Sequence, residues 1–390
     1  MTVDNIITDR FDFESAMLPI WEGDLVCNET IMPLDIGEKI KLLYNVTELV
    51  SVRSVDLKTE YEAGVDYNFD GESIELLPGT RVNFIGYEKY YSHNEAAPFH
   101  IMVKGGQPGD PDRDVFYSEE IWQYQLCVTY KCRKPADRFI PGTQAAQFER
   151  LIGKLRDGKD VTMMFYGDSI TFGASATYIS GRSPYTPTWS MLVTKALARR
   201  FGYKINYVPA NLPGTPPVPS EPEIYGSRGT ITYINPAVGG WTVVNGIEKY
   251  DLHVRPFIDK YGCDFFLLAF GMNDAGNSPE RECELQKNIT DSVLAQAPDC
   301  ELMLVSTMVP NPEAVNGWFG NQHIFEPEMM KLAADYNAAG VHCALAPMTS
   351  MSKYLLTRKH FRDYTGNNVN HPNDFMTRVY AHTVLKTVID

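Results

Sequence analysis

The chain has 390 residues, 44% of them hydrophobic and 22% charged, a composition typical of a folded globular protein. This length exceeds the usual size of one domain, so we expect two. The net charge of −14 and the pI near 5.1 argue against nucleic acid or an anionic membrane as the main partner, because either would need a basic surface.

Several features of the sequence bear on location and cofactors. No apolar run reaches the ~20 residues that span a bilayer, and the N-terminus lacks the basic and apolar segments of a secretory signal. The 7 cysteines are odd in number and scattered, which favours reduced thiols over a disulfide framework. We therefore expect a cytoplasmic protein. The 8 histidines show no metal-ligand spacing, so neither a metal nor an organic cofactor is expected.

The first part of the chain, residues 1–140, predicts β structure. Short stretches with strand character are separated by Gly, Pro and Asp about every ~10 residues, which is typical of a β-sandwich or jelly roll. The expected strands lie within residues 40–57, 64–71, 73–77, 99–103 and 124–130. Residues 1–140 are thus predicted to form a jelly-roll-like accessory domain, and 133–142 contains the linker to a second domain, 141–390.

In the second part, strand and helix patterns alternate. Strands are expected at 161–166, 205–208, 264–270, 302–309 and 341–346, and helices at 144–155, 190–201, 282–296, 328–339 and 374–388. Near-continuous apolar strands such as Phe265–Phe270 are what a parallel sheet covered on both faces requires. The sequence therefore predicts an α/β fold, a three-layer α/β/α domain of flavodoxin-like type, with its site at the carboxyl ends of the strands.

The most informative segment runs from Val161 to Ala176. An apolar strand leads into Gly167-Asp168-Ser169, and a region that can start a helix follows. A serine at a strand-to-helix turn can expose its hydroxyl near backbone N–H groups, which are what a nucleophile and an oxyanion need. The alternative is that Asp168 or Ser169 only caps the helix.

Three later segments are expected at the same edge of the sheet. The pair Gly239-Gly240 can bring backbone close to a ligand, or it can form a simple tight turn. Asn273, in Gly-Met-Asn-Asp after the most apolar strand, can aim an amide donor at an oxyanion, or it can cap a helix. His371, followed by a proline just before the last helix, can act as a general base or can be structural.

Together, Gly-Asp-Ser, Gly-Gly, Gly-x-Asn-Asp and His-Pro in this order resemble the SGNH hydrolase superfamily, also called the GDSL esterase family, over residues 145–390. The resemblance implies that Ser169 is the nucleophile and His371 the general base. The backbone N–H groups of Ser169 and Gly240, with the side chain of Asn273, would form the oxyanion hole. Gly240 is preferred to Gly239 because it lies five residues after Asn235, as in that family.

One position departs from the family's pattern. The family usually places an aspartate three residues before the catalytic histidine, and this chain has Asn368 there. Asn368 can orient the imidazole through its carbonyl oxygen but brings no charge. Asp363 is an alternative carboxylate, and a backbone carbonyl is a third possibility. Asp374 is read mainly as the cap of the last helix.

The resemblance also suggests a substrate. A β domain before such a hydrolase domain is similar to bacterial carbohydrate esterases that remove acetyl groups, so we expect an acetylated small molecule or oligosaccharide. Aromatic residues near the catalytic motifs can stack on sugar rings or can be ordinary core residues: Trp189, Tyr185, Trp241 and Trp318. The loop 90–98 would approach the cleft, in the same chain or across a homo-oligomer. The alternative is that the N-terminal domain only stabilises or dimerises the enzyme. A lipase for longer chains and a degenerate sugar-binding protein are the alternatives.

Overall fold

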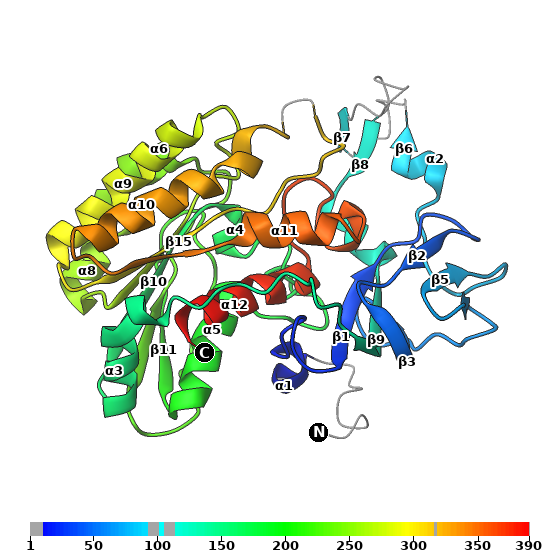
Figure 1. Ribbon diagram of the computed structural model, residues 1–390, viewed down its shortest axis with the longest axis horizontal. Coiled ribbons are helices and arrows are strands. Elements are labelled where there is room, and N and C mark those ends of the chain that lie inside the picture. Colours follow the sequence, from blue (N-terminus) through cyan, green and yellow to red (C-terminus); the bar gives the residue numbers. More distant parts are fainter. Residues whose placement is uncertain (1–10, 93–100, 105–113, 316–317, 390) are drawn as a thin grey trace.

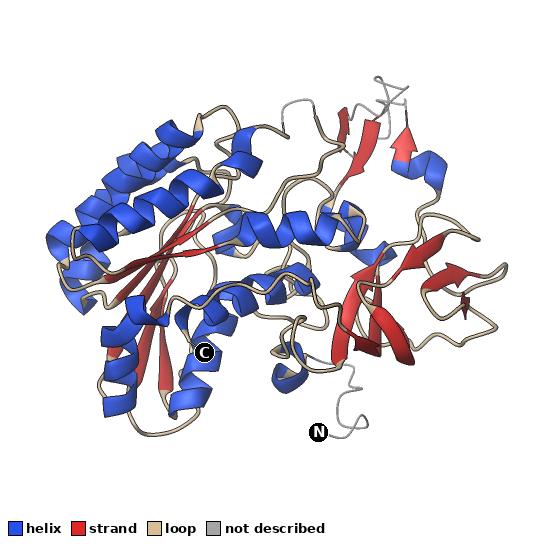
Figure 2. Cartoon of the chain, viewed as in Figure 1, coloured by secondary structure: helices blue, strands red, loops and turns tan. Residues whose placement is uncertain are grey.

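The computed structural model describes residues 11–92, 101–104, 114–315 and 318–389. Its C-terminal part is a parallel sheet with helices on both faces, and its N-terminal part consists of small sheets at the opposite end of the molecule (Figures 1 and 2).

The large sheet has seven strands, and their order positions the site. In spatial order they are β12 (Glu223–Ile224), β11 (Lys204–Val208), β13 (Thr230–Ile234), β10 (Val161–Gly167), β14 (Phe265–Ala269), β15 (Glu301–Val305) and β16 (Cys343–Ala346). All neighbours are parallel except β12. From β13 to β16 the order is flavodoxin-like, and β11 and β12 extend one edge. All five expected strands are present, whereas β12 and β13 were not expected.

Helices cover both faces of this sheet, which confirms the three layers (Figure 2). Side chains along β10 alternate between two cores: Met163 and Phe165 belong to one, Met164 and Tyr166 to the other. The first core includes α3 (Glu149–Asp157), α5 (Trp189–Phe201), α11 (Met348–Leu356) and α12 (Asp374–Val388). The second includes α6 (Val243–Glu248), α7 (Tyr250–His253), α8 (Arg255–Tyr261), α9 (Pro279–Gln296) and α10 (Glu326–Ala338). Sequence patterns indicated neither α6–α8 nor α11.

The N-terminal part is antiparallel but is not confirmed as a jelly roll. Its described strands form three separate three-stranded sheets. They are β1 (Leu25–Ile31) with β9 (Leu126–Arg133) and β3 (Asn45–Ser54), β2 (Lys39–Lys41) with β5 (Ser73–Leu76) and β4 (Tyr67–Phe69), and β6 (Tyr91–Ser92) with β8 (Asp114–Tyr117) and β7 (Ile101–Lys104). Frequent turn residues cut most strands to four residues or fewer, too short for the long paired strands of a sandwich. The short helix α1 (Phe13–Ala16) precedes β1, whereas the helix α2 (Tyr87–Tyr90) and the 3₁₀ helix η2 (Glu119–Tyr124) lie between strands.

The two parts share one hydrophobic core, so the N-terminal part packs against the C-terminal part. Trp21 meets the ring of His382 on α12 edge-on, with centroids 6.0 Å apart. The buried ammonium of Lys359 pairs with the buried carboxylate of Glu29 on β1. Arg378 on α12 donates to the backbone carbonyls of Cys27 and Asn28, at 2.9 and 2.7 Å.

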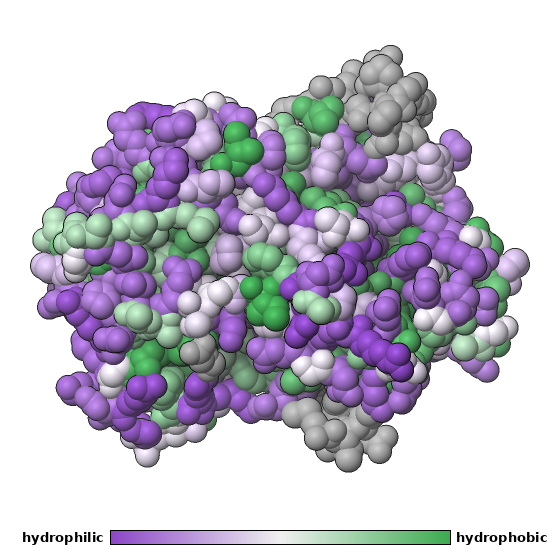
Figure 3. Space-filling view, in the orientation of Figure 1, coloured by the Kyte–Doolittle hydropathy of each residue, from purple (hydrophilic) through white to green (hydrophobic). Residues whose placement is uncertain are grey.

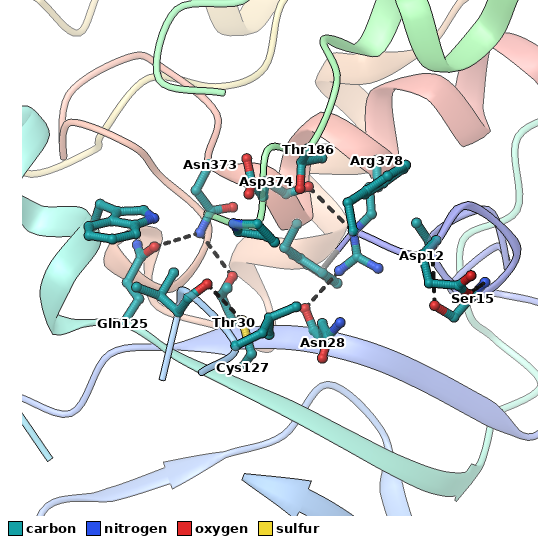
Figure 4. Close-up of a pocket in the computed structure, with 17 residues that line it drawn as sticks. Asp12, Ser15, Asn28, Thr30, Gln125, Cys127, Thr186, Asn373, Asp374 and Arg378 are labelled. Carbon is teal, nitrogen blue, oxygen red and sulfur yellow. Dashed lines mark hydrogen bonds between the residues drawn. The ribbon is translucent and has the colours of Figure 1, made fainter. Parts of the chain in front are cut away.

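Beside Arg378, residues of the two parts line a small pocket of about 30 Å³. Figure 4 labels polar residues that line this pocket, which come from β1, β9, α12, α1 and the segment before α5.

On the surface, hydrophilic residues cover most of the face in Figure 3, with hydrophobic ones scattered among them. All 7 cysteines are buried and unpaired. Within the described ranges, no helix has the length and apolar character needed to cross a bilayer.

Candidate active site

The nucleophile turn lies where β10 ends and α4 (Ser169–Phe172) begins. The carboxylate of Asp168 accepts from the backbone N–H of Ile170 at 2.9 Å and so caps α4. Burial raises the pKa of Asp168 to about 7. The capping role that the sequence left open between two residues therefore belongs to Asp168, and the hydroxyl of Ser169 makes a different contact.

That contact is with His371. The Nε2 atom of His371 lies 3.1 Å from Oγ of Ser169, within hydrogen-bond distance. The histidine sits in the loop before α12, and its backbone N–H donates to Oδ1 of Asn367 at 3.0 Å. The same oxygen accepts from the N–H groups of Val369 and Asn370, at 2.9 and 3.0 Å. Asn367 thus shapes the loop, a role that no sequence motif indicated.

The imidazole is poised to accept a proton. Burial lowers the pKa of His371 to about 4, so the ring is neutral at neutral pH. If Nε2 accepts from the Ser169 hydroxyl, Nδ1 carries the ring proton.

The atom facing Nδ1 is not the one expected. Oγ of Ser175 lies 3.3 Å from Nδ1 of His371. Asn368 is fully buried and bonds to the N-terminal part: its Oδ1 accepts from the hydroxyl of Tyr90 at 3.0 Å, and its Nδ2 donates to the carbonyl of Phe116 at 2.7 Å. The expectation that Asn368 orients the imidazole is therefore wrong in this structure, because both ends of its amide are used elsewhere.

The alternative carboxylates also have other partners. Asp363 accepts from the backbone N–H groups of Met32 and His360, at 2.8 and 3.0 Å, and so ties β1 to the C-terminal part. Asp374 accepts from the backbone N–H and the hydroxyl of Thr177, at 3.0 and 2.6 Å. The cap of α12 is Asn373 rather than Asp374. Of the loop 90–98, residues 93–98 lie outside the described residues.

Two hydrogen bonds bring the predicted oxyanion loops to the nucleophile turn. The N–H of Val238 donates to the carbonyl of Gly167, and the N–H of Met272 donates to the carboxylate of Asp168, each at 3.3 Å. Gly240 lies two residues after Val238, and Asn273 lies one residue after Met272. The motifs expected at one edge of the sheet are thus joined there.

The three predicted donors of the oxyanion hole have different surroundings. Nδ2 of Asn273 donates to the carbonyl of Trp241 at 2.9 Å, which fixes the amide and leaves its second N–H. A Cβ built on Gly239 would lie 3.8 Å from Cβ of Ser169, so this loop passes close to the nucleophile. Gly240 has a φ of 78°, a left-handed conformation that favours glycine. Within the described part of the chain, the N–H groups of Ser169 and Gly240 donate to no backbone carbonyl.

The aromatic residues differ in their surroundings. Trp189 is 1% exposed and donates to the carbonyl of Ile170 at 2.9 Å, so of its two possible roles the structure supports the core residue. Tyr185 is 55% exposed. Trp318 is half-buried and packs on Tyr117 from β8, with ring centroids 5.8 Å apart. The half-buried Trp241 packs on His253.

Comparison with known proteins places this site in a family. The family model described as GDSL-like Lipase/Acylhydrolase matches residues 163–381, and no curated protein matches the chain. Similar solved structures include a two-domain esterase active on acetylated mannans, at 18% identity and a TM-score of 0.44, over 63% of this chain and 53% of that one. This chain therefore matches only about half the length of that esterase.

Two further structures resemble the chain at low identity. One is the acetyl xylan esterase AlAXEase, at 17% identity and a TM-score of 0.41, over 59% of this chain and 100% of that one. Another is a lipase/acylhydrolase from Enterococcus faecalis, at 16% identity and a TM-score of 0.37, over 58% of this chain and 93% of that one. Because the family match runs from β10 into α12 and covers more than half of the residues, this chain belongs to the GDSL-like lipase/acylhydrolase family.

Proposed function

We propose that the protein is a serine esterase that removes short acyl groups, chiefly acetyl, from carbohydrates. The observation that carries this proposal is the hydrogen bond between Oγ of Ser169 and Nε2 of the neutral His371, at 3.1 Å. A serine hydroxyl paired with a neutral imidazole is the arrangement that activates an oxygen nucleophile.

In the proposed reaction, Oγ of Ser169 attacks the ester carbonyl carbon while its proton moves to Nε2 of His371. The N–H groups of Ser169 and Gly240 and the free N–H of Asn273 would bind the resulting oxyanion. The intermediate collapses, and the alcohol leaves with the proton from Nε2. Water then attacks the acyl-enzyme, again giving its proton to Nε2, and releases the acid with restoration of Ser169.

The surroundings of the nucleophile support a short acyl group. Ser169 is only 5% exposed, and the Gly239 backbone passes beside it. Polar groups hold this turn to its neighbours: the N–H of Val238 donates to the Gly167 carbonyl, and the N–H of Met272 donates to the Asp168 carboxylate. A long alkyl chain would have to displace or bury such groups without replacing their hydrogen bonds, which is unfavourable.

Aromatic side chains near the histidine loop support a carbohydrate alcohol. Tyr117 and Trp318 pack against a small buried cluster that contains Val369, two residues before His371. The C–H face of a pyranose can pack on such rings while its hydroxyls remain in water. The exposed Tyr185 lies in the segment that also carries Ser175.

The test compares acyl length and alcohol. We expect 4-nitrophenyl acetate to be hydrolysed with a higher kcat/KM than the butyrate and octanoate esters, and acetate to be released from acetylated xylo- or manno-oligosaccharides. Preference for octanoate would instead indicate a lipase. Binding of oligosaccharide without hydrolysis of any ester would indicate a sugar-binding protein. A cytoplasmic location and the absence of a cofactor stay predictions of the sequence.

A further inference from the structure

A chain of hydrogen bonds continues from His371 into the N-terminal part of the molecule. Oγ of Ser175 lies 3.3 Å from Nδ1 of His371 and also 3.4 Å from Oε1 of Glu119 in η2. With the ring proton on Nδ1, the Ser175 hydroxyl accepts from the imidazole and donates its own proton to the carboxylate. Each hydrogen bond therefore runs in the same direction, from Ser169 to His371, then to Ser175, and then to Glu119.

Ser175 is held in a conformation that its neighbours impose. Its φ is 65°, in the left-handed region that non-glycine residues seldom adopt. A Cβ on Gly366 would lie 2.3 Å from Cβ of Ser175, so only glycine permits this approach of the histidine loop. On the other side, Thr177 donates twice to Asp374 on α12. Backbone strain held from several directions is typical of positions with a function.

Glu119 is also held toward this segment. Ser118 caps η2 by accepting from the N–H of Glu120 at 3.0 Å. Arg182, from the segment that carries Ser175, donates to the backbone carbonyl of Glu119 at 3.3 Å and lies 5.3 Å from the centroid of the Trp122 ring. The start of η2 therefore packs against the catalytic domain beside Ser175.

We propose that Ser175 is a positioning residue that replaces the aspartate of related hydrolases, and that it links His371 to a carboxylate supplied by the N-terminal part, Glu119. This inference rests on the proposed function of Ser169 and His371. When His371 takes the proton of Ser169, the imidazolium charge is stabilised by the polarised hydroxyl of Ser175 and, one bond further, by Glu119. The protons on Nδ1 and on Ser175 stay on their atoms throughout.

The expected effect of each residue on kcat depends on how directly it contacts the imidazole of His371. A direct carboxylate is worth up to ~10⁴ in kcat in serine proteases, and a neutral hydroxyl should be worth less. Glu119 is exposed, so its charge is screened by solvent and salt. The other charged groups nearby are Asp374, bound to Thr177, and Arg182, bound to the Glu119 carbonyl.

The test is a double-mutant cycle with Ser175→Gly and Glu119→Gln. Glycine suits the left-handed backbone, so the first variant removes the hydroxyl while favouring the fold. For 4-nitrophenyl acetate at low salt, we expect Ser175→Gly to lower kcat by ~10- to 10²-fold with little change in KM, and Glu119→Gln by about 3- to 10-fold. Because Glu119 acts through Ser175, the double variant should match Ser175→Gly alone. Ser180→Ala, in the same segment, and Glu88→Gln, in α2, are the matched controls.

A second readout does not depend on turnover. NMR titration of the His371 ring should show its pKa falling in Glu119→Gln and rising in Ser175→Asp, because a nearby negative charge favours the imidazolium. If the two substitutions lower kcat independently, so that their effects multiply in the double variant, the link is overturned. Wild-type kcat in both single variants would overturn it too. In either case the proposed esterase function would stand. If the wild-type protein hydrolyses no ester, the proposed function fails, and the titration alone decides whether Glu119 is coupled to His371. An unchanged titration would then refute the link.

Discussion

Ser169 and His371 are 202 residues apart in the sequence, yet Oγ of one lies 3.1 Å from Nε2 of the other. Each is held by its own network: Asp168 caps the helix that Ser169 begins, and Asn367 accepts from the backbone N–H of His371. Because the two networks use different residues, each catalytic side chain can be altered without loss of the backbone around the other.

Asn273→Ala should lower kcat for 4-nitrophenyl acetate by ~10²- to 10³-fold, the usual effect of losing one oxyanion donor. KM should change much less, because the donor acts mainly on charge that develops in the transition state. Asn288→Ala, an exposed position on α9, is the matched control. A loss of less than about 3-fold for Asn273→Ala would show that the oxyanion is bound elsewhere.

The pH dependence of kcat/KM should have an unusually acidic lower limb. Burial lowers the pKa of His371 to about 4 from 6.5, so the general base stays neutral, and active, as the pH falls from 7 to 5. The same lowered pKa makes the folded chain less stable as the pH falls below 6.5. The reason is that the unfolded chain binds this proton near pH 6.5 and the folded chain only near pH 4. Intrinsic fluorescence at each pH separates the two effects. Half-maximal kcat/KM near pH 6.5 in the folded enzyme would contradict the prediction.

Lys359→Met should destabilise the whole chain. It leaves the fully buried carboxylate of Glu29 without its cation, at a cost of about 3–5 kcal/mol. Chemical denaturation measures this cost, with Lys353→Met on the exposed side of α11 as control. Adding Glu29→Gln should recover part of the loss, because the uncompensated charge is removed. Wild-type stability of Lys359→Met would show that the two parts do not depend on this pair.

Local patterns predicted much of the catalytic domain. The strand before Ser169 and the helix over 374–388 were recognised because their apolar residues are periodic and their ends carry turn or capping residues. The order of the motifs then indicated Ser169, Gly240, Asn273 and His371. The short strand Thr230–Ile234 and the helices Val243–Tyr261 were missed because each is too brief for a clear period.

The partner of the imidazole could not be predicted in the same way. Asn368 stands where related chains have aspartate, but Tyr90 and Phe116 bind its amide, and these residues are distant in the sequence. Ser175 contacts His371, and Glu119 contacts Ser175, only because three separate segments converge, and neither residue belongs to the four motifs. The small sheets of the N-terminal part could likewise not be predicted from the sequence, since strand spacing does not specify which strands pair.

The central claim is that Ser169 is a nucleophile activated by His371. Labelling with a fluorophosphonate, followed by mass spectrometry of the peptides, tests it most directly, because the reagent needs an activated serine and no substrate has to be known. We predict one adduct per chain, on Ser169, that is absent in Ser169→Ala and formed far more slowly in His371→Ala. An unlabelled wild-type protein, or an adduct on another serine, would contradict the claim.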